Sequence, residues 1–159
     1  GTDIEDVKKE LLEVNNLALE GKPEDMVITS HICRGNYHST FFTSGPYDSV
    51  ADYVFAKENV DALFLEYDDA RSGFAPLAKV SPDKKVVLGL ITTKTPQLEE
   101  KEVVIRRIHE AAKYIPLDRL YLSPQCGFAS CEIGNKLTEE EQWAKLKLVK
   151  EIAEEVWGE

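Results

Sequence analysis

Four side chains of the kinds that bind metal ions lie at or just after strand-like segments of the sequence. His31 and Cys33 are two residues apart, so in an extended segment both side chains point to the same side. Glu66 ends a second strand-like segment, and Cys126 follows the last one. An imidazole, a carboxylate and two thiolates are donors that suit tetrahedral Zn²⁺. We therefore predict that His31, Cys33, Glu66 and Cys126 bind one zinc ion.

Each of these residues has a simpler interpretation when it is taken singly. A histidine or cysteine at the end of a buried strand is commonly a packed side chain that binds nothing. The joint placement favours a metal site, because three different strands deliver ligand types to one edge of a sheet. Cys131, which lies beyond the last predicted strand, is interpreted as a thiol outside the site.

Other polar residues flank the predicted ligands in the same loops. Such neighbours often orient metal ligands through hydrogen bonds, and the sequence does not rank them. They are Arg34, Asn36, Asp68, Asp69 and Arg71.

The hydrophobic pattern predicts alternating helices and strands. Short apolar and β-branched runs predict strands over residues 26–30, 62–65, 85–92 and 119–123. Apolar residues at helical spacing predict helices over residues 4–17, around 50–54, over 99–115 and over 138–156, with Trp143 and Ile152 on the buried face of the last helix. This alternation is typical of a parallel α/β sheet, whose strands all end at one edge, where the four ligands can meet.

The chain length leaves two architectures open. With 159 residues the chain is expected to form a single domain over residues 1–159. A complete (β/α)8 barrel needs about 250 residues, so four strand–helix units preceded by one helix form either a small open sheet or half of a barrel. Half of a barrel leaves two strand edges uncovered, and two copies could pair through these edges as a homodimer.

Composition excludes several classes of partner. Lys and Arg number 19 against 29 Asp and Glu, which gives a net charge of −10 and argues against binding to nucleic acid or to an anionic membrane. Apolar runs are shorter than the roughly 20 residues of a membrane span, and no secretion leader is recognised. Three cysteines do not make a disulfide framework, so we expect a cytoplasmic protein whose thiols stay reduced.

Three segments of the chain together resemble a known enzyme family. Residues 31–36 read HICRGN, residues 65–73 read LEYDDARSG and residues 122–128 read LSPQCGF. In this order, and with a fitting stretch at residues 138–146, they resemble the C-terminal catalytic domain of cobalamin-independent methionine synthase, and most closely its short bacterial branch. The resemblance covers nearly the whole chain. It implies the C-terminal half of a (β/α)8 barrel, with His31, Cys33, Glu66 and Cys126 as zinc ligands.

The resemblance also implies an activity. The family transfers a methyl group from 5-methyltetrahydrofolate-type donors to the thiol of homocysteine and produces methionine. Glu66, the hardest of the four donors, is the ligand expected to yield to the substrate thiol. Longer members carry a histidine, thought to relay protons, where this chain has Lys94; we interpret Lys94 as a solvated loop residue, with binding of an anionic substrate group as the alternative. Because substrate-gripping residues come largely from the other half of the barrel, we expect the isolated chain to be inactive.

Two other functions remain open on the sequence. The first is a zinc-dependent alkyl transfer to a thiol other than homocysteine, since the predicted zinc half of the site does not distinguish between thiols. The second is a structural zinc module without a reaction. Glu66 argues against the second, because structural zinc sites favour cysteine and histidine ligands alone.

Overall fold

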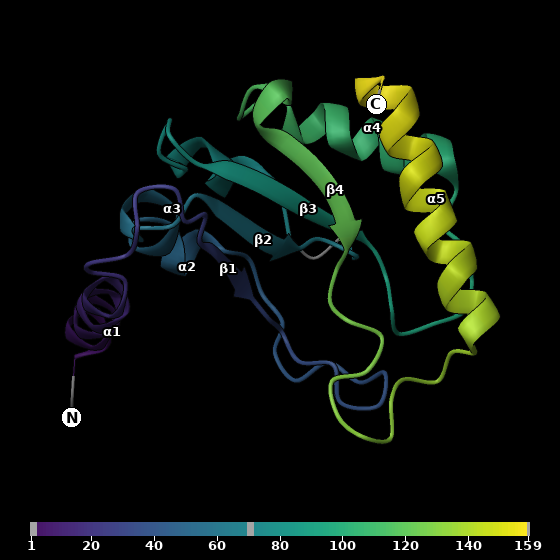
Figure 1. Ribbon diagram of the computed structural model, residues 1–159, viewed down its shortest axis with the longest axis horizontal. Coiled ribbons are helices and arrows are strands. Elements are labelled where there is room, and N and C mark those ends of the chain that lie inside the picture. Colours follow the sequence, from purple (N-terminus) through teal and green to yellow (C-terminus); the bar gives the residue numbers. More distant parts are fainter. Residues whose placement is uncertain (1–2, 70–71, 159) are drawn as a thin grey trace.

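The computed structural model describes residues 3–69 and 72–158 of the chain. Its helices and strands are α1 (Ile4–Ala18), β1 (Thr29–Ile32), α2 (Asp48–Ala51), α3 (Val54–Lys57), β2 (Ala62–Glu66), the 3₁₀ helix η1 (Ala75–Lys79), β3 (Lys85–Ile91), α4 (Lys101–Ala111), the 3₁₀ helix η2 (Leu117–Arg119), β4 (Leu120–Pro124) and α5 (Glu139–Trp157). Figure 1 shows the strands side by side, with α5 alongside β4.

The four strands form one parallel sheet in the order β1-β2-β3-β4. This arrangement confirms the expected α/β class. In the register His31 lies opposite Phe64, and Leu65 lies opposite Leu88. β3 lies inside the sheet and is buried from Val86 to Ile91. Because both of its faces are covered, its sequence there is apolar throughout instead of alternating with polar residues. β1 and β4 are the edge strands of the sheet, and the loops that follow them meet beyond its carboxyl end (Figure 1).

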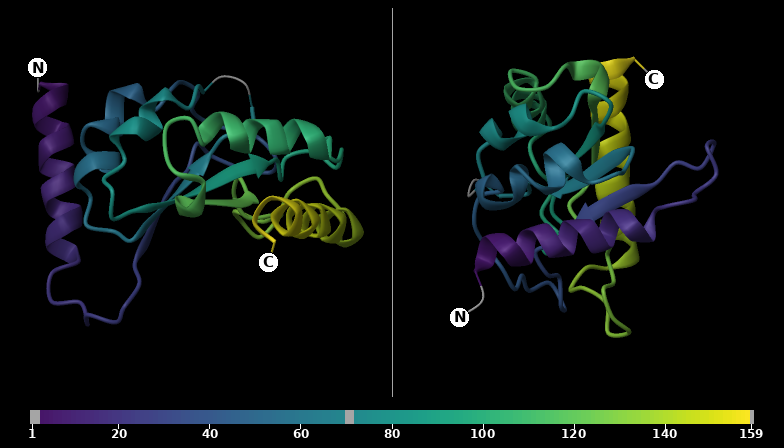
Figure 2. Two further views of the ribbon diagram at one scale, coloured as in Figure 1. Left: turned by 90° about the horizontal axis from the view of Figure 1, so that it is seen from above. Right: turned by 90° about the vertical axis from the view of Figure 1, so that its left-hand side faces the viewer.

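The hydrophobic core joins the sheet to the helices. Phe55 of α3, Leu88 of β3, Ile108 of α4 and Ile152 of α5 are all buried in it. By contrast, α1 has no buried residue, and Figure 2 shows it at the opposite end of the molecule from α5. Side-chain hydrogen bonds attach α1 to the end of α3 and the segment after it, because Asn16 bonds the Lys57 carbonyl and the Asn59 N–H. Its apolar residues, such as Leu11, are exposed.

The first strand differs from the sequence expectation. Residues 26–30 were expected to form it, but β1 spans Thr29–Ile32, while Met26 and Val27 are exposed. The reason is pairing: Thr29 to Ile32 align with Ala62 to Leu65 of β2, and the preceding residues have no strand beside them. His31 therefore lies within the strand, and Cys33 is the first residue after it.

Two further expectations need correction. Trp143 of α5 is 60% exposed, while Lys145 of the same helix is fully buried. Lys145 reaches Glu99 and the Gln97 carbonyl, so an ion pair occupies the position that an apolar side chain was expected to fill. In addition, β2 is followed within the described residues by the short η1 in place of an α-helix.

None of the helices in the described part of the chain is long and apolar enough to cross a membrane.

Candidate metal centre

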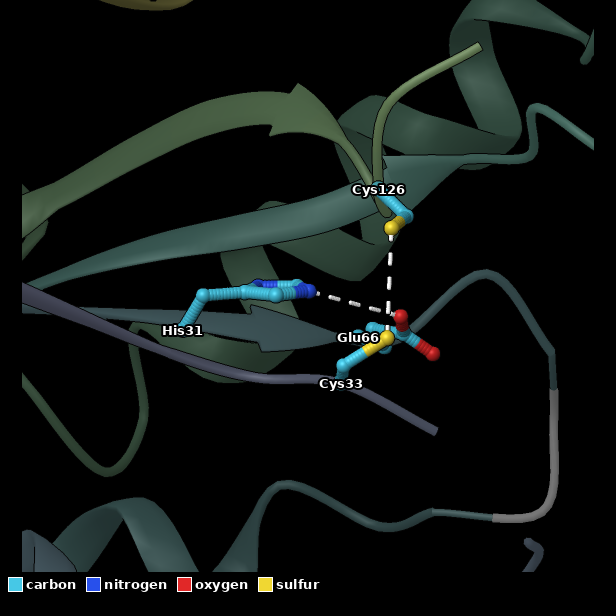
Figure 3. Close-up of side chains that lie close together, drawn as sticks. All are labelled: His31, Cys33, Glu66 and Cys126. Atoms are coloured by element: carbon cyan, nitrogen blue, oxygen red, sulfur yellow. Dashed lines mark hydrogen bonds and ion pairs between the residues drawn. The ribbon is translucent and has the colours of Figure 1, made fainter. Parts of the chain in front are cut away.

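The four predicted ligands meet at the carboxyl end of the sheet. His31 comes from β1, Cys33 from the residue after it, Glu66 from the end of β2, and Cys126 from the loop after β4. One ligand atom from each lies within 4.8 Å of the others. Figure 3 shows the four side chains pointing toward one another. The structure thus brings together all four residues that the sequence singled out.

The spacing of the sulfur atoms fits a tetrahedral metal ion. Cys33 Sγ and Cys126 Sγ are 3.9 Å apart, and both cysteines are free. Two thiolates on one tetrahedral zinc ion, each at about 2.3 Å from it, are separated by roughly 3.8 Å. The observed separation therefore suits two ligands of one ion better than a disulfide, in which the sulfurs are about 2.05 Å apart.

His31 is oriented so that one ring nitrogen faces the centre. Its Nδ1 is 3.2 Å from the carbonyl oxygen of Phe64, to which the Nδ1–H tautomer donates, and its Nε2 is 3.6 Å from Glu66 Oε1. Metal-binding histidines commonly donate their second ring N–H to a carbonyl in this way. The hydrogen bond to Phe64 leaves Nε2 free to bind an ion.

The electrostatics of the cluster favour a positive charge at its centre. Interaction with Cys126, as the main cause, and then with the Glu66 carboxylate raises the pKa of His31 to about 11. In return, His31 lowers the pKa of the Cys126 thiol. The anionic donors thus hold a proton on His31 in the absence of metal, and a divalent cation would supply the same positive charge.

Glu66 is the most buried of the four ligands. It is 1% exposed, and neither carboxylate oxygen has a hydrogen-bond partner within the described residues. A buried carboxylate without hydrogen bonds is unfavourable unless a cation neutralises it. Within the described residues this cation is protonated His31, whose Nε2 lies 3.6 Å from Glu66 Oε1, and a metal ion held by the four side chains would take its place.

The backbone around Cys33 is shaped by a glycine. The Gly35 N–H donates to Cys33 Sγ at 3.3 Å. Gly35 has φ +93°, and a Cβ placed on it would lie 2.7 Å from the backbone nitrogen of Phe42. Both conditions require glycine, so Gly35 fixes the turn that carries the first thiol.

Tyr47 was not identified from the sequence. Its hydroxyl accepts from the Glu66 N–H at 2.9 Å and donates to the Glu66 carbonyl at 3.2 Å. The Arg34 guanidinium lies over the Tyr47 ring, 4.5 Å from its centroid. Burial, as the main cause, raises the pKa of Tyr47 to about 12, so the hydroxyl stays protonated. No spacing signal relates Tyr47 to Glu66, because the contact exists only in the folded chain.

A comparison with protein families identifies the chain. The family described as the catalytic domain of cobalamin-independent synthase matches residues 11–155. This chain belongs to that family. The resemblance inferred from the three sequence segments is therefore confirmed.

Relatives of this synthase domain are longer than the chain. The uncharacterized protein YxjH of Bacillus subtilis is 54% identical over 159 residues, which cover 99% of this chain and 42% of YxjH. A putative vitamin-B12 independent methionine synthase from Listeria monocytogenes is 42% identical, with a TM-score of 0.77, over 100% of this chain and 44% of that one. The chain thus spans about two fifths of the relatives it matches.

A second solved structure extends the comparison to a more distant relative. A B12-independent methionine synthase from Shewanella sp. W3-18-1, in complex with selenomethionine, is 25% identical, with a TM-score of 0.78 over 96% of this chain and 44% of that one. These matches confirm the expected fold, in which the four parallel strand units form half of a methionine synthase (β/α)8 barrel.

A cleft of about 410 Å³ lies at the candidate metal centre of this synthase domain. It is lined by residues of three strand ends, among them His31, Phe64, Ser123 and Cys126. Its volume is in the range of sites for small molecules.

Lys94 is neither a solvated residue nor free to bind an anion. Its Nζ lies 2.7 Å from Asp68 Oδ2, and the two side chains are only 12% and 8% exposed. Both sequence interpretations of Lys94 are therefore corrected: an internal ion pair joins the loops that follow β2 and β3. The pair forms because parallel strands place these two loops side by side.

The remaining flanking residues have different roles. Asn36 is 3% exposed and bonds residues of the loops after β3 and β4. Asp69 uses its carbonyl to accept from Arg107, and Arg71 lies outside the described residues. Cys131 is not a member of the ligand cluster found in the described part of the chain.

Proposed function

We propose that this domain binds Zn²⁺ through His31, Cys33, Glu66 and Cys126 and presents it to a substrate thiol for methylation. The observation that carries the proposal is the convergence of a buried carboxylate, Glu66, with two thiols and an imidazole whose ligand atoms all lie within 4.8 Å of one another. When bound, zinc keeps a coordinated thiol deprotonated at neutral pH.

The protein residues tune the reactivity of that thiol. Two thiolates and one carboxylate outweigh the charge of the divalent ion, so the donor set keeps a bound substrate sulfur electron-rich. Cys33 and His31 are exposed, whereas Glu66 is buried. We retain Glu66 as the ligand that yields, because a carboxylate is the hardest of the four donors.

The substrate we assign is homocysteine, and the methyl donor is a 5-methyltetrahydrofolate-type compound. In the reaction the substrate sulfur forms a bond to the methyl carbon, the bond from that carbon to the donor nitrogen breaks, and the nitrogen takes a proton. Because the chain spans about two fifths of its relatives, we assign to it zinc binding and thiol binding, with the complete transfer requiring the remainder of a barrel. The isolated chain is expected to be inactive in methyl transfer.

The absorption spectrum of the Co²⁺-substituted chain tests this proposal. Homocysteine is expected to change the sulfur-to-cobalt bands, and homoserine, which replaces the thiol by a hydroxyl, is expected to leave them unchanged. Parallel titrations with cysteine and 2-mercaptoethanol measure whether another thiol is preferred, which would favour the alternative alkyl transferase. If no thiol alters the spectrum, the site is structural and the proposed function fails.

A further inference from the structure

The two candidate thiol ligands come from opposite edges of the sheet. Cys33 follows β1 and Cys126 follows β4, with β2 and β3 between these strands. Neighbouring strands are about 4.8 Å apart, so three such spacings amount to roughly 14 Å. Yet the two sulfur atoms are 3.9 Å from each other. The loops after β1 and β4 must therefore lean toward each other across the end of β3, and some contact must hold them there.

Thr93, two residues after β3, lies where the two loops meet. Its side chain is fully buried. Its hydroxyl accepts from Asn36 Nδ2 at 2.9 Å and from Gln125 Nε2 at 3.1 Å, and it donates to the Gly127 carbonyl at 2.9 Å. One hydroxyl has one donor and two acceptor positions, which these three bonds fill, and a longer fourth contact comes from Asn135 Nδ2 at 3.4 Å.

The partners of Thr93 flank the two candidate thiol ligands. Asn36 is three residues after Cys33, while Gln125 and Gly127 are the immediate neighbours of Cys126. Asn36 also donates directly to the Gly127 carbonyl at 2.9 Å. The Thr93 N–H donates to Gln125 Oε1, at 2.6 Å. Thr93 is thus bonded on one side to the first cysteine loop and on the other to both neighbours of the second cysteine.

Asn135 closes this network from the outside. Its Nδ2 donates to the Thr93 carbonyl at 2.8 Å and to Asn36 Oδ1 at 3.2 Å. Asn135 is half-buried, whereas Asn36 and Gln125 are only 3% and 2% exposed. A buried network with every member bonded holds a single geometry, because any displacement leaves polar groups without partners.

Gly89 provides an independent reason for the path of the second loop. The pairing of β3 with β4 shifts register between Gly89 and Ile91, and the Gln125 N–H donates to the Ile91 carbonyl. A Cβ on Gly89 would lie 2.6 Å from Gln125 Cα and 2.8 Å from the Leu65 carbonyl oxygen. The missing side chain therefore allows the backbone before Cys126 to cross close over β3, toward Cys33.

We propose that Thr93 is a positioning residue, which sets the separation of Cys33 and Cys126 through its bonds to Asn36, Gln125 and Gly127. The inference rests on the proposed zinc site in one respect, the identity of the ion that the two sulfurs bind. The geometry it concerns, the approach of two loops from opposite sheet edges, does not depend on which ion that is.

The test compares Thr93→Val, which removes the hydroxyl and keeps the shape, with Thr93→Ser, which keeps the hydroxyl. Thr92→Val is the matched control, because Thr92 bonds the Lys94 N–H and none of the network residues. Zinc affinity, measured by chelator competition, is expected to fall about 10–100-fold in Thr93→Val, as for other residues that orient ligands. Thr93→Ser and Thr92→Val are expected to stay close to the unaltered chain.

A second readout needs no metal. In metal-free chains carrying Cys131→Ser, equilibration with glutathione disulfide oxidises the Cys33 and Cys126 thiols to one disulfide and releases two reduced glutathione molecules. The equilibrium constant reports how often the two sulfurs meet, and we expect it to fall about tenfold or more in Thr93→Val. If the unaltered chain binds no zinc, the zinc proposal fails, while this equilibrium still decides the role of Thr93.

The outcomes are distinct. A folded Thr93→Val chain that keeps both the zinc affinity and the disulfide equilibrium of the unaltered chain overturns the proposal. If circular dichroism shows that Thr93→Val does not fold, Asn135→Ala replaces it, because its half-buried side chain leaves no closed cavity. In Asn135→Ala we expect smaller losses of zinc affinity and of the disulfide equilibrium constant. If both stay unchanged in this variant, the proposal is likewise overturned.

Discussion

The hydroxyl of Tyr47 occupies the place of a strand partner for Glu66. β1 ends at Ile32, opposite Leu65, so Glu66 lies one residue beyond the last pair of the β1–β2 ladder. The Tyr47 hydroxyl bonds both the N–H and the carbonyl of Glu66 at this point. The backbone of the buried ligand is therefore held by one side chain from the loop that follows β1.

Removal of this hydroxyl is expected to affect both stability and metal binding. Tyr47→Phe leaves a buried N–H and a buried carbonyl without their partner, which costs about 1–3 kcal/mol of unfolding free energy. Zinc affinity falls as well, because Glu66 is less firmly placed. Urea denaturation and chelator competition measure the two effects. Tyr53→Phe is the control, since the Tyr53 hydroxyl bonds only the exposed Glu5, and equal effects in both variants would contradict this role of Tyr47.

The cysteines are expected to differ sharply in their contribution to metal binding. Cys126→Ser removes a thiolate from the cluster, so the chain should lose most of its bound zinc. Cys131→Ser should retain full zinc content, because Cys131 stands apart from the four ligands. Metal analysis of the freshly purified chains checks both expectations. Full zinc content in Cys126→Ser would remove this thiol from the site.

Zinc binding is expected to weaken as the pH falls. In the metal-free chain, Cys126 and Glu66 raise the pKa of His31 to about 11, so a proton occupies the imidazole at neutral pH. The ion needs a neutral imidazole and must displace that proton, and each displaced proton changes the affinity about tenfold per pH unit. Affinities measured at several pH values from 6.5 to 8 should rise with pH. In His109→Gln, a control on α4, zinc affinity should rise with pH at the same slope. A zinc affinity of the unaltered chain that does not change with pH would contradict the predicted competition between zinc and the proton on His31.

The Lys94–Asp68 pair is expected to contribute to stability. Lys94→Met leaves the mostly buried Asp68 carboxylate without its cation, at a cost of about 3 kcal/mol or more. The double variant Lys94→Met, Asp68→Leu should recover much of this loss, because it buries no unpaired charge. Lys79→Met is the control: Lys79 pairs with Asp52 at the surface, where ion pairs contribute little. Denaturation midpoints that are equal for Lys94→Met and Lys79→Met would contradict the prediction.

The isolated chain is expected to associate as a homodimer through its open sheet edges. β1 and β4 each have one edge unpaired in the described sheet, and Tyr121 on β4 is 41% exposed. Light scattering should show concentration-dependent dimers, and Tyr121→Lys should weaken them. Tyr114→Lys, at a comparably exposed tyrosine (43%) after α4, should not. A monomer at every concentration would rule out this association.

The sequence determined the fold class and predicted the four residues that meet at the candidate site. Strand-like apolar runs alternate along the chain with apolar residues at helical spacing. This pattern predicts parallel strands with helices between them, since each element must bury one face. Because parallel strands end at one edge, residues such as His31, Glu66 and Cys126 could be expected together before any coordinates were known. The helix predicted over residues 138–156 corresponds to α5, which begins with a capping box of Thr138 and Glu141, a feature that is local in the sequence.

Only the tertiary structure decided what holds these ligands in place. Three features depend on which elements become neighbours in the fold. They are the start of β1, the burial of Lys145 against Glu99, and the Lys94–Asp68 pair. The bonds of Tyr47 to Glu66 and of Thr93 to both cysteine loops likewise join segments far apart in the chain. Such contacts have no period and no fixed spacing in the sequence, because they arise between side chains that only the packed sheet brings together.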